Sequence, residues 1–231
     1  MRRIVDLTLP LTNGMRTWDV KPPFTILPYA NASTFALGFS TKLLVMEDHT
    51  GTHVDAPIHF YDGELRRPRG RTIADVAPEK LVGEAVVLDV SAKRPDEPVD
   101  AAMLARAAHD VDVRGGDVVL VRFWPHGWGR PTMDAFLAAR GLTRDACEWL
   151  LERGAKCVGV DHPNLEGAVS AANGNADCPG HVLLLHPDRE MPIVENLVGL
   201  DALGDARFTF VALPLRIDGA TGSPVRAVAL V

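Results

Sequence analysis

The chain has 231 residues, 47% of them hydrophobic and 23% charged, and a formal net charge of −6. This composition is ordinary for a globular protein, and the length suits a single α/β domain over residues 1–231. The negative charge argues against nucleic acid as the main partner, no apolar run is long enough to span a bilayer, and three scattered cysteines favour a reducing, cytoplasmic compartment.

Apolar runs bounded by turn residues predict strands at several points along the chain. These strands are expected over residues 4–8, 40–47, 84–90, 117–124 and 156–161, and two more are expected in the tail from residue 208 onward. Helix-prone segments predict helices over residues 100–109, 132–140 and 143–153, with Asp100 and Thr143 as N-caps. Between the first two strands, residues 15–24 are too rich in proline to form regular structure.

The stretch from Asp48 to Phe60 carries most of the recognisable chemistry, because it holds His49, His53, His59 and Asp55. Neutral imidazole and carboxylate are the usual ligands of zinc and of manganese. His53 and Asp55 are two residues apart, so on an extended backbone they point to one face. A glycine and a proline in the stretch argue against a helix, so we expect a loop that runs into a short strand. The alternative is three unrelated surface or core histidines.

The run from His49 to Phe60, which reads HTGTHVDAPIHF, resembles the signature of the metal-dependent cyclase family. That family includes bacterial kynurenine formamidases, isatin hydrolases and several cyclases of natural-product pathways. The resemblance runs from about residue 4 to the C-terminus and is weaker around residues 60–130, and His162 after the Asp161 strand departs from the family pattern. It implies an α/β (α+β) fold of the swivelling β/β/α type, a mixed sheet flanked by helices, assembled as a homodimer or homotetramer.

The resemblance also implies a set of metal ligands, with one or two divalent ions, Zn²⁺ or Mn²⁺, as the cofactor. His49, His53 and Asp55 are the candidate ligands of the first ion, as their chemistry and spacing also indicate. Glu195 and Asp55 would both reach the metal centre, with His181 completing a second site. The alternative is that His181 caps or packs its own helix and that a single ion binds.

Other side chains are assigned roles around the metal centre. His59 matches the proton-transfer residue of the family, and an imidazole that titrates near neutrality can take a proton from water and give it to a leaving amine. Trp18 matches a tryptophan that lines the substrate pocket, the alternative being a loop tryptophan packed on the core. His126 lies between Trp124 and Trp128, where it could shape a substrate pocket or simply pack.

The function predicted is that of a metal-dependent amidohydrolase, an arylformamidase or cyclic amidase acting on a small molecule. Metal-bound hydroxide would attack the carbonyl of an aryl formamide or a cyclic amide, such as N-formylkynurenine or isatin. A polyketide-type cyclase or a lactone hydrolase on the same site is the alternative. A non-catalytic metal-binding protein ranks below both, because His59 has no evident ligand duty and a structural zinc site is normally closed by four ligands.

Overall fold

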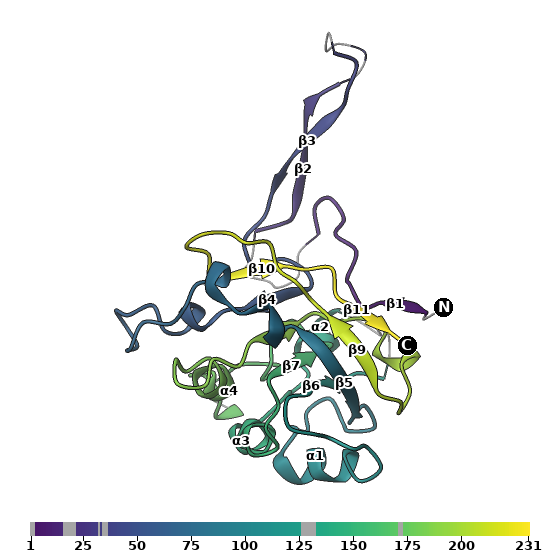
Figure 1. Ribbon diagram of the computed structural model, residues 1–231, viewed down its shortest axis with the longest axis vertical. Coiled ribbons are helices and arrows are strands. Elements are labelled where there is room, and N and C mark those ends of the chain that lie inside the picture. Colours follow the sequence, from purple (N-terminus) through teal and green to yellow (C-terminus); the bar gives the residue numbers. More distant parts are fainter. Residues whose placement is uncertain (1–2, 16–21, 32, 34–36, 126–132, 171–172) are drawn as a thin grey trace.

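The computed structural model describes residues 3–15, 22–31, 33, 37–125, 133–170 and 173–231. Its main feature is a curled mixed sheet that, within these residues, has nine strands (Figure 1). In spatial order the strands are β1 (Ile4–Asp6), β11 (Val228–Leu230), β9 (Phe208–Val211), β5 (Val82–Asp89), β6 (Val118–Arg122), β7 (Cys157–Val160), β8 (Ile193–Glu195), β4 (His53–Asp55) and β10 (Gly222–Pro224). This arrangement is the mixed sheet flanked by helices that the sequence predicted.

Helices lie mainly on one face of the sheet, beside the parallel strands β5 to β8 (Figure 1). The α-helices are α1 (Ala101–Ala107), α2 (Met133–Leu137), α3 (Arg144–Glu152) and α4 (Pro179–Leu184). Short 3-10 turns are η1 (Pro57–His59), η2 (Ile73–Asp75), η3 (Pro78–Lys80) and η5 (Leu200–Ala202). No helix among the described residues is long and apolar enough to cross a membrane.

The central strands are buried on both faces, which explains their nearly continuous apolar sequences. In β6, Val119 and Val121 pack with the helices, while Val118 and Leu120 belong to a second core on the opposite face. Because successive side chains of a strand alternate between faces, a strand with two buried faces needs apolar residues at every position. The burial pattern of the sheet therefore follows directly from the sequence.

The starts of helices α1 and α3 were predicted at the right positions, but only one of the two predicted N-cap side chains forms a capping hydrogen bond. The Asp100 side chain caps α1 by accepting a hydrogen bond from the Met103 N–H at 2.7 Å. Thr143 also precedes α3, but its hydroxyl does not cap it. Its Oγ1 lies 3.1 Å from the Val99 carbonyl oxygen and 2.6 Å from the Asp145 carboxylate. Both of these are acceptors, so the single hydroxyl proton is shared between them or donated to one, and no helix N–H donates to Oγ1.

Two segments differ from the sequence prediction. The expected strand over residues 40–47 is β3 (Thr41–Val45), but its antiparallel partner β2 (Thr25–Ala30) was not predicted. The two strands form a hairpin that projects from the rest of the chain (Figure 1). The tail holds three strands instead of two, because Gly222–Pro224 forms β10 beside β4. The pairing of β10 with β4 matters for function, because β4 carries the candidate ligands His53 and Asp55.

Candidate active site

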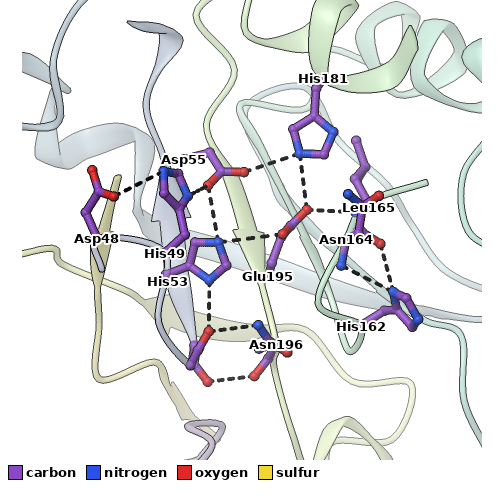
Figure 2. A network of polar contacts seen from close by, with 12 residues as sticks. Asp48, His49, His53, Asp55, His162, Asn164, Leu165, His181, Glu195 and Asn196 are labelled. Carbon is purple, nitrogen blue, oxygen red and sulfur yellow. Dashed lines mark hydrogen bonds and ion pairs between the residues drawn. The ribbon is translucent and has the colours of Figure 1, made fainter. Parts of the chain in front are cut away.

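Strand β4 is the centre of the site because it lies between β8 and β10 at one side of the sheet. The register places His53 opposite Glu195 and Asp55 opposite Gly222. His53 Nε2 lies 3.3 Å from Asp55 Oδ1 and 3.6 Å from Glu195 Oε2 (Figure 2). His53 and Asp55 thus share a face, as their two-residue spacing indicated, and Glu195 joins them from the neighbouring strand.

His49 reaches the same carboxylate from the loop that precedes β4. Its Nδ1 lies 2.6 Å from Asp55 Oδ1, and its Nε2 lies 2.8 Å from the hydroxyl of Thr221. Thr221 is itself held by Asp48, whose Oδ2 accepts hydrogen bonds from the Thr221 N–H and hydroxyl, both at 2.8 Å. A Cβ atom at Gly222 would come within 2.6 Å of the His49 ring, so glycine at this position makes room for the imidazole.

His181 enters the site from the first turn of α4. Its Nε2 lies 3.4 Å from Asp55 Oδ2 and 3.2 Å from Glu195 Oε1. The residues from His186 to Glu190 form a turn between α4 and β8. The structure brings both side chains to Asp55, as the two-ion hypothesis requires.

The hydrogen bonds of two histidines fix which ring nitrogen faces the carboxylates. His53 Nδ1 lies 2.8 Å from the carbonyl oxygen of Gly51, and a carbonyl can only accept. His181 Nδ1 lies 2.6 Å from a carboxylate oxygen of Glu166, which is an acceptor when ionised. In each neutral ring the proton is therefore on Nδ1, and the lone pair of Nε2 points toward Asp55 and Glu195 (Figure 2). Lone pairs that face carboxylate oxygens repel them unless a cation lies between.

The buried carboxylates of the site also favour binding of a cation. Asp55 and Glu166 are each 1% exposed and Glu195 is 3% exposed, and none forms an ion pair with a described lysine or arginine. Burial acts to raise the pKa of Asp55, but the charge of His49 and contacts with His181 outweigh it and hold that pKa well below its usual range. Asp55 Oδ2 is buried and accepts no hydrogen bond from the described residues.

A divalent ion fits this donor set. Nitrogen lone pairs and buried carboxylate oxygens are the ligands that zinc and manganese take in proteins. Burial acts to lower the pKa of His181, yet the charge of Glu166 and contacts with Asp55 and Glu195 raise it well above its usual value. An ion among these groups would supply the positive charge that protonated imidazole otherwise provides. Three sets of side chains each offer ligand atoms within 4.8 Å of one another. The sets are His49, Asp55 and His59; His53, Asp55 and Glu195; and Glu166, Cys178 and His181.

His59 occupies the outer side of the cluster, at the end of η1. Its ring centroid lies 4.0 Å from that of His49 and 6.2 Å from that of His181, and no described residue hydrogen-bonds to the ring. The residue keeps an exposed edge, but burial of the ring lowers its pKa to about 3, and the charge of Asp55 only partly offsets this. A nitrogen of His59 lies within 4.8 Å of ligand atoms of His49 and Asp55, close enough to bind an ion as well as to move a proton.

Several residues of the site were not identified from the sequence. Glu166 lies in the loop after β7, in a stretch that reads as polar and irregular, so nothing marked it as buried. Phe60 follows His59, and its ring stacks on the His181 ring with centroids 4.8 Å apart. The Arg66 guanidinium lies 5.3 Å from the Phe60 ring centroid. Phe60 stands inside the motif itself, so its position was a usable signal.

Of the remaining sequence candidates, the structure describes some and not others. Trp18 and His126 lie outside the described residues. His162 is 1% exposed, and its Nδ1 lies 3.0 Å from the carbonyl oxygen of Asn164, so it contacts the loop whose Leu165 N–H donates to Glu195 (Figure 2). Trp124 is buried two residues after the end of β6. His162 therefore contacts the backbone beside the ligand cluster.

The chain is similar to known proteins over nearly its whole length. A kynurenine formamidase of Bacillus thuringiensis (strain Al Hakam) is 31% identical over 225 residues, which cover 97% of this chain and 95% of that protein. Isatin hydrolase A from Ralstonia solanacearum superposes with a TM-score of 0.83 and 29% identity, over 100% of this chain and 92% of that one. Isatin hydrolase A from Labrenzia aggregata, solved with benzyl benzoate, superposes with a TM-score of 0.85 and 26% identity, over 100% of this chain and 94% of that one.

A family model matches the chain in addition to these individual relatives. The family model "Putative cyclase" matches residues 5–167, which include the whole of η1, β4 and the loop that holds His49. The match also extends through the parallel strands β5 to β7 and ends next to Glu166. Together with the relatives that cover nearly the full length, it shows that the chain belongs to the cyclase family.

Proposed function

We propose that the protein is a metal-dependent hydrolase that opens the amide bond of an aryl formamide or of a cyclic amide. The observation that carries the proposal is the convergence of the Nε2 atoms of His53 and His181 on the carboxylates of Asp55 and Glu195. Relatives named kynurenine formamidase and neighbours named isatin hydrolase support this class of substrate. N-formylkynurenine and isatin-like lactams are therefore the first candidates.

The ligand arrangement supports one ion and leaves room for a second. His49, His53 and Asp55 would hold the first ion, Zn²⁺ or Mn²⁺. The two oxygens of Asp55 face different partners, since Oδ1 faces His49 and His53 while Oδ2 faces His181. Asp55 could therefore bridge to a second ion held by His181 and Glu195. A divalent ion so bound polarises a carbonyl group and lowers the pKa of water.

His59 is proposed as the group that moves protons. Its ring stands beside His49 on the exposed side of the cluster, where a proton can pass between water and the leaving amine. The Phe60 ring on His181 offers an apolar face against which a planar substrate can stack. Trp18 is the further substrate-binding candidate, on the grounds of sequence resemblance alone.

Metal analysis combined with a substrate screen tests the proposal. Purified protein, protein stripped with a chelator, and stripped protein reloaded with zinc or manganese would be assayed on N-formylkynurenine, isatin and simple lactones. We expect hydrolysis of an amide substrate that disappears on stripping and returns on reloading. Turnover of lactones alone, ring closure without hydrolysis, or activity unaffected by complete metal removal would each contradict the proposal.

A further inference from the structure

The loop from Tyr61 to Arg71, here called the arginine loop, differs in charge from the rest of the chain. It holds four arginines and two acidic residues, whereas the whole chain has a net charge of −6. It follows closely after η1, and in Figure 1 it is the blue loop that extends to the left, above α4. An excess of positive charge therefore lies next to the turn that carries His59.

Both ends of the arginine loop are held against the active site. The Gly70 N–H donates to the Tyr61 carbonyl oxygen at 2.7 Å and closes the loop. The Tyr61 hydroxyl donates to the carbonyl oxygen of Val182 at 2.8 Å, on the helix that carries His181. A Cβ atom at Gly70 would come within 2.5 Å of the Pro57 carbonyl carbon, so the loop also lies directly against η1. The loop therefore has a fixed position relative to η1 and α4.

Arg66 extends from this loop to an aromatic ring of the active site. Its guanidinium carbon lies 5.3 Å from the ring centroid of Phe60. The Phe60 ring stacks on the ring of His181, with centroids 4.8 Å apart and 26° between the planes. The guanidinium is therefore separated from the His181 ring by no more than the sum of these two distances. Arg66 is half-buried in this position, whereas Arg67 and Arg69 are exposed.

The charge of Arg66 is not used within the described part of the chain. The Asp62 carboxylate accepts two backbone N–H groups of the loop, both at 2.9 Å. Arg71 is committed elsewhere, since its Nε lies 2.8 Å from the carboxylate of Glu190. Among the described residues no carboxylate forms an ion pair with Arg66. A planar guanidinium matches the two oxygens of a carboxylate, so Arg66 is suited to bind an acid from outside.

We propose that Arg66 binds a carboxylate of the substrate, so that the site takes aryl formamides bearing an acid group in preference to neutral cyclic amides. This inference rests on the proposed function and names the substrate class within it. The carboxylate of N-formylkynurenine is on a side chain ortho to the formamide, and bonds of about 1.5 Å give it a reach of roughly 8 Å from the reacting carbonyl. A hydrogen bond of about 3 Å extends that reach. The acid can therefore meet Arg66 while the carbonyl lies at the ligand cluster.

Charge on a larger scale supports the same class of substrate. An acid that approaches a chain of net charge −6 is repelled by the protein as a whole. The arginine loop reverses this repulsion locally, beside the ligand cluster, and the exposed Arg67 and Arg69 contribute to the attraction. The competing explanation is that Arg66 only packs on Phe60 as a cation on an aromatic ring. In that case the charge of the substrate would not affect its binding.

The test compares two substrates that differ in charge and little else. N-formylkynurenine and its primary carboxamide share the formamide and the ring, but only the first has a carboxylate. Arg66→Met removes the guanidinium and keeps an apolar stem against Phe60. Arg67→Met is the matched control, because it removes the same charge from the next, exposed residue. Steady-state kinetics of the metal-loaded proteins gives kcat and KM, and calorimetric titration with kynurenine, the product, measures binding without turnover.

We expect the wild type and Arg67→Met to have a kcat/KM for the acid about 10–100-fold above that for the carboxamide, mainly through KM. Arg66→Met should lose this preference, bind kynurenine about 10–100-fold more weakly and retain its activity on the carboxamide. Circular dichroism checks that the variants are folded.

A wild type without the preference, a preference that Arg66→Met retains, or an equal loss in Arg67→Met would overturn this inference and leave the proposed function standing. Failure of every metal-loaded protein to hydrolyse either compound would overturn the proposed function, and this assignment with it.

Discussion

Glu166 holds His181 at two points. One carboxylate oxygen lies 2.6 Å from Nδ1 of the ring, and the other accepts a hydrogen bond from the His181 backbone N–H at 2.9 Å. The glutamate is 1% exposed, and a Cβ atom at Gly180 would lie 2.9 Å from its Oε1, so the chain packs closely around it. The ring is thereby oriented with Nε2 toward Asp55 and Glu195, as in the carboxylate–histidine pairs that support metal ligands.

The first prediction concerns this pair. Glu166→Gln keeps the size of the side chain but removes the charge that orients and polarises His181, so metal affinity should fall roughly 10–100-fold. Titration of apo-protein with zinc or manganese measures both the affinity and the number of ions. Glu148→Gln is the control, because Glu148 is a half-exposed carboxylate on α3 whose ion-pair partner among the described residues is Arg144.

The same titration decides between one ion and two. We expect two ions in the wild type and one in His181→Ala, because His181 would serve only the second site. A stoichiometry of one that His181→Ala leaves unchanged would rule out the two-ion arrangement. In that case Glu166 would be a structural residue of the loop after β7, and its substitution should affect stability without affecting metal affinity.

The second prediction concerns His53. Its side chain is 1% exposed, and its Nε2 faces both Asp55 and Glu195, so His53→Ala should lose most of the bound metal. Elemental analysis of the dialysed protein measures the loss. His109→Ala is the control, because the His109 side chain is 82% exposed and lies far along the sequence from the site. Undiminished metal in His53→Ala would exclude this residue as a ligand.

The third prediction separates His59 from the ligands. If His59 moves protons, His59→Ala should retain its metal while kcat drops roughly 10²–10⁴-fold. The measurement pairs metal content with steady-state kinetics on the best substrate found. Metal lost in step with activity would instead identify His59 as a ligand, a role that its distance to His49 and Asp55 allows.

The fourth prediction concerns pH and Asp161, which follows β7. Its carboxylate accepts hydrogen bonds from the N–H groups of Phe123 at 2.7 Å and Trp124 at 3.4 Å. Burial raises the pKa of Asp161 from its ordinary 3.8 to about 7, against the pull of those N–H groups. A folded-state pKa above the unfolded value gives stability that is fully present below the unfolded pKa and is lost as pH rises through the folded one.

Asp161→Asn removes this dependence, because an amide does not titrate. The free energy of unfolding of the wild type, minus that of the variant, should therefore decrease as pH rises from about 4 to about 7. Urea denaturation of both proteins in the presence of a chelator measures the difference at each pH. A difference that stays constant across this range would show that the pKa of Asp161 is the same in the folded and the unfolded protein.

The sequence predicted correctly that His53 and Asp55 share a face, because this information is local. The spacing of His53 and Asp55 on a strand determines that they share a face, and the central strands were recognisable from continuous apolar runs. The placement of His181 and Glu195 came from the family resemblance. Their approach to Asp55 in the structure agrees with it, although metal binding by these residues is still a prediction.

What the sequence did not reveal depends on contacts between distant segments. The residues of β10, Gly222-Ser-Pro, have little intrinsic preference for a strand, and they form one only because β4 pairs with them. Strand β2 contains Pro28 and follows a proline-rich stretch, which hid its pairing with β3. Glu166 lies in an irregular loop, and only the packing of α4 against that loop shows that it is buried.

The position of β4 between β8 and β10 has a consequence for biosynthesis. Asp48 is hydrogen-bonded to Thr221, 173 residues later, and Thr52 donates to the carbonyl of Asn196, 144 residues later. During translation the histidine motif therefore leaves the ribosome long before the segments that complete its surroundings. A nascent or truncated chain that stops before β8 would carry the entire motif and still lack Glu195. The ligand cluster can close only when almost all of the protein has been made, so tight metal binding would report a fully synthesised chain.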